Sequence, residues 1–307
     1  VNGVSYSLDA GKVLGVVGES GSGKSVSAMS ILRLLDGNGY IDSGEILFNG
    51  QDLTKLSMNE MYKIRGNEIS MIFQEPMTSL NPVFRIGAQL DEVIALHDGE
   101  GKTPEDIKAR SIHLLEMAGI ANSEGVYKMY PHELSGGMRQ RVMIAMALSC
   151  NPRLIIADEP TTALDVTIQA QILDLLRNLK DKINSSIMLI THDLGVIAEM
   201  ADYVVVMYAG RVVEKGTAQE IFANPAHPYT IGLMASKPMV GKKVDKLYSI
   251  PGKVPNPINM PNYCYFKDRC EMCVEGCQGE YPHMIQLSPT HMVSCYRYYG
   301  KEDAQNG

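Results

Sequence analysis

The chain has 307 residues, 45% of them hydrophobic, which is enough for one large domain or two ordinary domains with a substantial buried core. Its 28 basic and 35 acidic residues give a net charge of −7, so it lacks the basic field of a nucleic-acid binder. No apolar run approaches the 18 residues of a membrane-spanning helix.

The first residues carry no methionine, no charged leader and no apolar signal core. We therefore expect the sequence to start inside a domain whose first strand is missing. The elements that follow alternate short apolar strands with periodic helices, a pattern typical of a parallel sheet covered by helices. Residues 13–17 predict a buried strand that runs into a glycine-rich turn, and a helix is expected from about residue 24 to residue 35.

A small antiparallel flap is expected next, because residues 44–48 read as a strand and Asn49–Gly50 favours a tight turn. From about residue 78 to residue 150 helical patterns dominate, which predicts an inserted helical subdomain. Within it, Thr103 and Pro104 have the positions of a helix N-cap and a first-turn proline.

The pattern then returns to strand at 154–157, to a helix whose apolar face runs over 168–179, and to strand at 187–190. Residues 204–214 predict a hairpin around Ala209–Gly210. Prolines become frequent after about residue 235. The sequence therefore predicts an α/β domain over 1–235 and a small proline- and cysteine-rich extension over 236–307.

Gly18–Ser25 fits the phosphate-loop pattern G-x-x-x-x-G-K-[ST] between a predicted strand and a predicted helix. Glycines let backbone N–H groups face one anion, Lys24 reaches the β- and γ-phosphates, and the Ser25 hydroxyl binds Mg²⁺. A plain glycine turn is the alternative, and the strand–helix context disfavours it. The predicted nucleotide-binding residues are Gly18, Ser20, Gly21, Ser22, Gly23, Lys24, Ser25 and Val26.

A second chemical motif is the apolar strand that ends in Asp158 and Glu159. Ligands of open α/β sheets bind at the carboxyl ends of the strands. Asp158 is expected to hold Mg²⁺ through water, and Glu159 is expected to polarise the water that attacks the γ-phosphate. The alternative, helix capping ahead of Pro160, loses weight beside a phosphate loop.

Residues 134–140 place Ser135 and bare N–H groups at the start of another helix, which makes a second phosphate-binding device. One bound nucleotide cannot use both devices. We infer that each faces a nucleotide held on a different subunit.

With these motifs, the first 235 residues resemble the ATPase subunits of ABC transporters. The resemblance implies that Ser135, Gly136, Gly137 and Gln140 belong to the signature motif, which completes the site of a head-to-tail partner ATPase. The cofactors implied are ATP and Mg²⁺.

The same resemblance implies roles for single residues that would otherwise read as surface or structural positions. Gln74 begins a loop that senses Mg²⁺ and the membrane partner, and Asp165 lies in the loop that crosses the dimer interface. His192 resembles the switch histidine that contacts the γ-phosphate and orients Glu159. The expected catalytic residues are Glu159, His192 and Gln74, and the expected Mg²⁺ ligands are Ser25, Gln74 and Asp158.

The adenine-stacking aromatic of this family lies on a strand upstream of the phosphate loop, where this sequence does not reach. Tyr6 is on another segment and is expected in the core, so no base-stacking residue is assigned.

Three segments, 74–82, 226–230 and 250–257, are similar to segments of dipeptide, oligopeptide and nickel importer ATPases. This implies ATP-driven import of peptides, with import of nickel or another small solute as the alternative. The implied partners are a second ABC ATPase, two membrane permease subunits and, indirectly, a substrate-binding protein. The implied location is peripheral, on the cytoplasmic face of the plasma membrane.

In that subfamily a C-terminal extension carries four cysteines, and some members are thought to bind a [4Fe–4S] cluster there. Zinc is an alternative favoured by the Cys270-x-x-Cys273 spacing, and disulfides are disfavoured in the reducing cytosol. Asn262–Tyr263, Lys267–Asp268 and the additional Cys273 depart from the family pattern, so the choice between Cys273 and Cys277 stays open. The matching residues are Cys264, Cys270, Cys277 and Cys295, while Cys150 is expected to be a small buried hydrophobe.

Two rival functions fit less well. A soluble ABC protein that acts on nucleic acid would need a long coiled-coil insert or tandem ATPase halves, and this chain has one phosphate loop and one signature motif. An inert subunit that binds ATP without cleaving it would be expected to lack Glu159 or His192.

Overall fold

The computed structural model describes residues 1–75, 79–162, 164–236, 248–256 and 258–300. Contacts between residues divide the chain into two compact units. The first unit comprises Val1–Ser7, Val13–Ser27 and Thr191–Gly307, and the second comprises Leu8–Lys12 and Ala28–Ile190. Parts of the quoted motifs lie outside the described residues, namely Pro76, Met77, Thr78, Ala163 and Pro257.

The strands of the first unit follow the order β1-β7-β8-β10-β9. β1 pairs with β7 in parallel, and the remaining neighbours pair antiparallel. The predicted hairpin is confirmed, because Ala209 and Gly210, with φ of 46° and 81°, join β7 to β8. The strands are β1 (Val13–Val17), β7 (Tyr203–Tyr208), β8 (Arg211–Thr217), β10 (Met292–Val293) and β9 (Ile285–Gln286).

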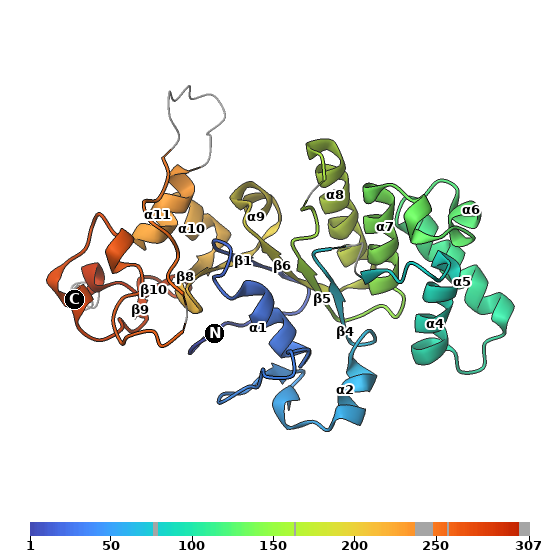
Figure 1. Ribbon diagram of the computed structural model, residues 1–307, viewed down its shortest axis with the longest axis horizontal. Helices are drawn as coiled ribbons and strands as arrows, with labels where there is room; N and C mark the ends of the chain where they lie inside the picture. The colour runs from blue at the N-terminus through green and yellow to red at the C-terminus, as the bar shows by residue number, and fades with distance from the viewer. Residues whose placement is uncertain (76–78, 163, 237–247, 257, 301–307) are drawn as a thin grey trace. The chain divides into compact units, whose positions relative to one another are not determined.

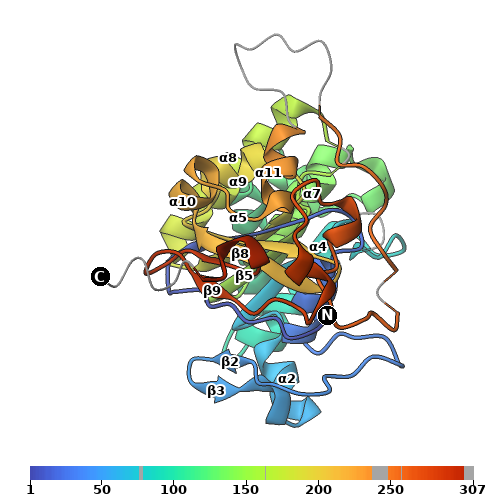
Figure 2. The same cartoon turned by 90° about the vertical axis from the view of Figure 1, so that its left-hand side faces the viewer.

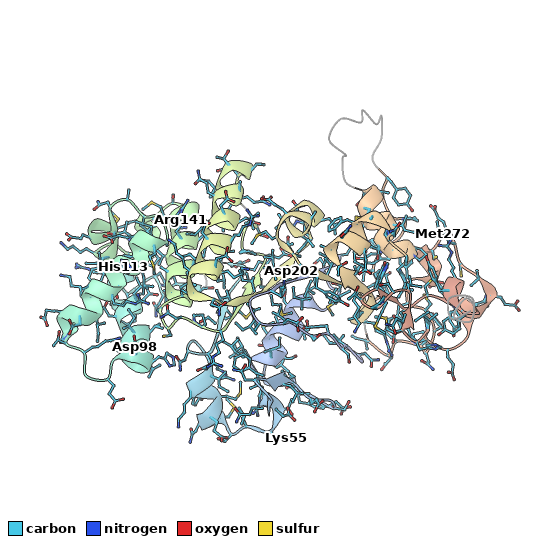
Figure 3. All side chains as sticks on the ribbon, turned by 180° about the vertical axis from the view of Figure 1, so that it is seen from behind. Lys55, Asp98, His113, Arg141, Asp202 and Met272 are labelled. Carbon is cyan, nitrogen blue, oxygen red and sulfur yellow. The ribbon has the colours of Figure 1, made fainter. Side chains whose placement is uncertain are left out.

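Asp202, labelled in Figure 3, is hydrogen-bonded to the start of β1, the strand that leads into the phosphate loop. Its carboxylate accepts a hydrogen bond from the Val13 N–H at 2.8 Å, and its own N–H donates to the Val13 carbonyl at 2.9 Å. α9 (Leu194–Met200) packs on the same strand. A Cβ on Gly15 would lie 2.7 Å from Ile197 Cδ1, so a glycine is needed for this close approach.

The C-terminal residues of the first unit continue its sheet. β10 pairs with β8, with Val293 opposite Glu214, and β9 pairs with β10 (Figure 1). Three 3-10 turns complete this region, at Lys267–Arg269, Glu275–Gln278 and Tyr296–Tyr298. A separate cysteine-rich extension is therefore not confirmed, because these strands lengthen the sheet that also holds β1. The unit also contains α10 (Ala218–Ala223) and α11 (Pro228–Ala235).

The second unit contains three adjacent parallel strands, β4 (Ile69–Ile72), β5 (Leu154–Asp158) and β6 (Ser186–Thr191). Local sequence patterns predicted β5 and β6 but not β4. The expected flap is present in shorter form: β2 (Leu47–Phe48) and β3 (Gln51–Asp52) join through Asn49–Gly50, beside α2 (Met58–Ile64) in Figure 2.

The helices of the second unit begin and end with local signals. α5 (Pro104–Met117) starts after the predicted cap Thr103, whose hydroxyl accepts from the Asp106 N–H. The helix from Lys24, α1 (Lys24–Ile31), ends earlier than expected because Arg33 takes a left-handed φ of 52°. Helices α4 to α7 pack together (Figure 1), and the remaining helices are α4 (Ile86–Asp98), α6 (Ser123–Tyr127), α7 (Gly136–Ala147) and α8 (Val166–Ile183).

Within the described residues, every helix is too short or too polar to cross a membrane.

Candidate functional site

Glycine is required at several positions of the phosphate loop. Gly18, Gly21 and Gly23 have φ of 155°, 79° and 95°, a region that favours glycine strongly over other residues. At Gly18 a Cβ would lie only 2.2 Å from the carbonyl oxygen of Met207 at the end of β7. The spacing of glycines in the motif therefore follows from the bends of this backbone.

Lys24 donates hydrogen bonds to the backbone of its own phosphate loop. Its ammonium donates to the carbonyl oxygens of Gly18 at 2.7 Å and Glu19 at 3.1 Å, and the side chain is buried. The Ser22 hydroxyl is also buried and has no hydrogen-bond partner among the described residues. Because Lys24 and Ser25 open α1, an anion bound here would meet a cation and the positive end of a helix.

The two carboxylates after β5 differ in exposure. Asp158 ends the strand and is buried, while Glu159 is partly exposed and has a left-handed φ of 46°. This backbone conformation is costly for a residue other than glycine and recurs at functional sites. The Glu159 N–H donates to the Ile190 carbonyl at 2.8 Å, which fixes the turn against β6.

Gln74 and Glu159, which lie 85 residues apart in the sequence, are brought together. The Gln74 amide Nε2 donates to Glu159 Oε2 at 3.2 Å, and the Thr162 hydroxyl donates to the same oxygen at 2.8 Å. The side chain expected to act as base is therefore oriented by two donors.

The signature segment and the segment with Asp165 are neighbours in the second unit. Ser135 caps α7 by accepting from the Met138 N–H at 3.3 Å, and Asp165 caps α8 by accepting from the Ile168 N–H at 3.0 Å. A Cβ on Gly137 would meet Ile168 Cγ2 at 3.1 Å. Ser135 and Gly136 are exposed, as a contact with another subunit requires.

Gln140, the last of the residues expected to act across a dimer interface, differs from Ser135 and Gly136 because its side chain is buried. Its side chain is 2% exposed, and Nε2 has no hydrogen-bond partner in the part of the chain that the structure describes. In this conformation its side chain does not face another subunit.

His192 lies in the first unit, directly after β6, and its side chain is exposed. The next residue, Asp193, starts α9: its carboxylate accepts from the Gly195 N–H at 2.8 Å, and its N–H donates to the Thr191 hydroxyl at 3.0 Å. The expected site residues thus fall on both units, with Lys24, Ser25 and His192 on the first and Gln74, Asp158, Glu159, Ser135 and Asp165 on the second.

All six cysteines are free thiols. Burial, and to a smaller extent the neighbouring Cys277, Cys295 and Cys270, raise the pKa of the Cys264 thiol to about 12. These side chains therefore lie near one another. However, no three His, Cys, Asp or Glu side chains of the described residues are placed so that they could hold a metal ion. The expected iron–sulfur or zinc site is not confirmed.

Cys150, which was expected to be a small buried hydrophobe, is only partly buried. Its sulfur lies 3.5 Å from the hydroxyl of Ser149, which follows α7, and burial raises the pKa of the Cys150 thiol.

Comparison with known proteins assigns the family. The sequence profile of the ABC transporter family matches residues 1–162, and a second profile, the C-terminal region of oligopeptide/dipeptide transporters, matches residues 213–277. The chain belongs to the ABC transporter family. As an ABC ATPase it binds ATP with Mg²⁺ and hydrolyses ATP.

Relatives match this ABC ATPase over nearly its whole length. The oligopeptide transport ATP-binding protein AppD of Bacillus subtilis is 51% identical, with 97% of this chain and 90% of that protein covered. The oligopeptide protein OppD of Haemophilus influenzae is 52% identical, with 96% and 90% covered. The dipeptide transport protein DppD of Escherichia coli is 47% identical, with 99% and 92% covered.

Solved structures agree with the family. A dimer of the ATP-binding cassette MJ0796 with ADP and phosphate has a TM-score of 0.63 at 28% identity and covers 70% of this chain and 89% of that chain. The protein cbiO1 of Clostridium perfringens, part of the ABC transporter complex cbiONQ, has a TM-score of 0.61 at 28% identity, with 72% and 83% covered.

Two residues that contact the phosphate loop were not anticipated. The Tyr229 hydroxyl accepts from the Glu19 N–H at 2.7 Å, and Arg269 pairs with the Glu19 carboxylate. Tyr229 lies in the 226–230 segment already noted for its family likeness, whereas nothing near Arg269 in the sequence indicates its partner.

Proposed function

We propose that this ABC ATPase hydrolyses ATP to energise the import of oligopeptides or dipeptides. The observation that carries the proposal is the match of full-length relatives named as oligopeptide and dipeptide transport proteins, together with a phosphate loop that is built around Lys24. The second profile match, over residues 213–277, supports the same substrate class. Import of nickel is the alternative, and no observation on this chain favours it.

We propose further that the site is composite. The exposed Ser135 and Gly136 of one chain would meet the nucleotide held by Lys24 and Ser25 of a second ABC ATPase, head to tail. The dimeric state of the structural relative MJ0796 supports this arrangement, as does the exposure of Asp165 next to the signature segment.

In this proposal each residue has one role in hydrolysis. Lys24 neutralises the β- and γ-phosphates, and Glu159 accepts a proton from the attacking water while Gln74 and Thr162 hold its carboxylate. His192 contacts the γ-phosphate and orients Glu159. Ser25, Gln74 and Asp158 would hold Mg²⁺ through their oxygen atoms, and the bound ion would supply positive charge to the phosphates.

The membrane partner is proposed to be a pair of permease subunits, which places this chain at the cytoplasmic face of the membrane. The second unit has an apolar pocket of about 490 Å³ that includes Phe73, the neighbour of Gln74. An exposed Phe73 beside a residue of the catalytic site would let an apolar permease segment influence hydrolysis. The main apolar lining residues are Leu32, Leu34, Ile69, Phe73, Leu80 and Met143.

Within residues 236–307, which we propose as a distinct functional region, Cys264, Cys270, Cys277 and Cys295 are proposed to bind a [4Fe–4S] cluster, or zinc. Support comes from their mutual influence on pKa and from the burial of three of the thiols. Metal binding needs thiolates, so loading would have to displace protons from thiols whose pKa is raised. Iron and zinc analysis of anaerobically purified protein, with a visible spectrum, tests this; absence of both metals would refute it.

Uptake by the importer tests the substrate class. The chain, its partner ATPase, the permeases and the binding protein are reconstituted in vesicles, and ATP-driven uptake of labelled di- and oligopeptides is compared with uptake of ⁶³Ni²⁺. We expect peptide uptake that is abolished by Lys24→Ala and unaffected by Lys102→Ala, because Lys102 is a partly exposed lysine that pairs with Asp98. Uptake of nickel without peptide would overturn the proposal.

A further inference from the structure

A salt bridge joins the C-terminal part of the first unit to the phosphate loop. Arg269 Nη1 donates to Glu19 Oε2 at 2.7 Å, and Arg269 Nη2 donates to Glu19 Oε1 at 3.0 Å. Glu19 is the second residue of the loop, and the two partners are 250 positions apart in the sequence. Two parallel charge-assisted hydrogen bonds fix both the position and the plane of the carboxylate.

Contacts other than the one with Glu19 also hold the guanidinium of Arg269 in place. Its Nε donates to the Pro251 carbonyl at 2.7 Å, and the group lies 5.7 Å from the Tyr208 ring and 5.9 Å from the Phe266 ring. The Arg269 side chain is 6% exposed, whereas that of Glu19 is 31% exposed. Its hydrogen bond to Glu19 also raises the pKa of Arg269. The arginine is thus a fixed anchor, and the loop is the part that it holds.

Tyr229 holds the backbone of the same loop residue. Its hydroxyl accepts from the Glu19 N–H at 2.7 Å, and its ring, fully buried, lies 4.7 Å from Tyr208 and 5.4 Å from Phe266. One aromatic cluster therefore supports both contacts with Glu19. The carbonyl of Glu19 in turn accepts from Lys24, which ties this residue to the cation that binds phosphate.

Charge gives the salt bridge a role in nucleotide binding. ATP brings several negative charges to this loop, and a carboxylate at Glu19 without a partner would repel them. Pairing with Arg269 cancels that charge and keeps the side chain turned onto the C-terminal segment. Loss of Arg269 would therefore harm ATP binding in two ways, through repulsion and through a looser loop.

We propose that Arg269 is a positioning residue for ATP: through Glu19 it holds the phosphate loop in its binding conformation and removes a charge that opposes the nucleotide. The inference rests on the proposed function only in that ATP binds at this loop. Arg269 itself touches neither the nucleotide nor the attacking water.

The test is the KM for ATP, with kcat, of the reconstituted importer, together with ATP affinity of the full-length chain by calorimetry. We expect Arg269→Ala to raise KM and the dissociation constant by about three- to tenfold, with kcat within about twofold of wild type. Arg269→Lys should be intermediate, because an ammonium cannot make the bidentate contact.

Glu19→Gln changes the other partner of the same salt bridge, so its result does not depend on how well Arg269→Ala folds. Glu19→Gln removes the repelling charge, so this variant should bind ATP at least as tightly as Arg269→Ala. Adding Arg269→Ala to Glu19→Gln should raise the KM and the dissociation constant for ATP by less than Arg269→Ala does in the wild-type chain. Lys267→Ala is the matched control, since Lys267 is on the same turn and lies over Tyr263 instead of contacting Glu19. It should leave KM unchanged.

Each outcome is decisive. If wild type binds no ATP, the proposed function fails. If wild type binds ATP and Arg269→Ala binds it equally well, the inference alone fails. Equal effects of Arg269→Ala in the wild-type and Glu19→Gln backgrounds would also overturn it, because the arginine would then act independently of the loop carboxylate.

Discussion

Among single residues, Glu159 has the surroundings expected of a general base. Gln74 and Thr162 both donate to Oε2, and the left-handed backbone holds the side chain at the end of β5. Replacement by an amide keeps the shape but removes the proton acceptor. We predict that Glu159→Gln lowers the rate of ATP hydrolysis by about a hundredfold or more while ATP binding is retained. Single-turnover hydrolysis and equilibrium binding of ATP measure the two effects separately.

Glu68→Gln is the matched control for this prediction, because Glu68 is a carboxylate of the same unit that pairs with Arg153 at the surface. It should hydrolyse ATP like wild type. Hydrolysis by Glu159→Gln at the parental rate would remove Glu159 from the mechanism.

A second prediction at this scale concerns pH. His227 is buried, its Nδ1 accepts from the Tyr229 N–H at 3.0 Å, and burial lowers its pKa to about 4 although the nearby Glu214 carboxylate acts in the opposite direction. In the unfolded chain the ring titrates near 6.5. The unfolded state therefore binds more protons between pH 4 and pH 6.5, and the free energy of unfolding falls as pH drops through that window.

We predict that His227→Asn, whose side-chain oxygen can still accept from Tyr229, is less stable than wild type at pH 7 but loses about 2 kcal/mol less between pH 7 and pH 5. Denaturant unfolding at the two pH values measures the difference. The control is His113→Asn, because the ring of His113, labelled in Figure 3, is largely exposed. Identical pH dependence of His227→Asn and wild type would contradict the assignment.

Local patterns were sufficient to predict some contacts of single residues and insufficient for others. The glycines and Lys24 of the phosphate loop all lie within residues 18–24, so the spacing of the motif predicts their geometry. The family resemblance indicated Gln74 and the end of an apolar strand indicated Glu159, but their hydrogen bond was not predicted. Arg269 and Glu19 meet only because the C-terminal turns pack against the loop, and no pattern of the intervening residues encodes this contact.

Among elements, the N-terminus of α7 combines stability with proposed function. Ser135 Oγ accepts from the Met138 N–H, as an N-cap does, and the same exposed hydroxyl is proposed to meet a nucleotide of another subunit. We predict that Ser135→Ala lowers the free energy of unfolding by about 1 kcal/mol and also lowers hydrolysis by the assembled importer. Unfolding in urea and ATPase assays measure the two effects.

Thr103→Ala separates capping from function, because Thr103 caps α5 of the same unit with an equivalent hydrogen bond to the Asp106 N–H. Thr103→Ala should lower the free energy of unfolding by about as much as Ser135→Ala and leave ATP hydrolysis unchanged. A loss of hydrolysis as large as that of Ser135→Ala would mean that capping alone explains both variants.

Elements with strong local signals were predicted well. The hairpin of β7 and β8 and the start of α5 follow from turn and capping residues. β9 and β10 were missed, because each has only two residues and is stabilised by pairing with distant β8 rather than by its own pattern. The helix from Lys24 was overestimated because the apolar pattern continues past the left-handed Arg33.

For the whole molecule, the decisive question is whether one chain contains a complete site. Lys24 binds nucleotide in the proposal, and Ser135 acts on a nucleotide held by the second ABC ATPase, which in this test is another copy of the chain. Lys24→Ala and Ser135→Arg should then each be inactive alone. When the two variants are mixed in equal amounts, about half of the dimers contain one chain of each variant. One of the two sites in such a dimer is intact, so about a quarter of wild-type hydrolysis should return. ATPase rates of the variants and of their mixture measure this.

The control mixture combines Lys24→Ala with a chain that carries both substitutions, because no dimer in it has an intact site, and it should stay inactive. Dilution gives an independent measurement: hydrolysis per wild-type chain should fall as the dimer dissociates. Full activity of a chain that sedimentation shows to be monomeric, or no recovery in the first mixture although dimers form, would mean that Ser135 and Lys24 do not share a site between subunits.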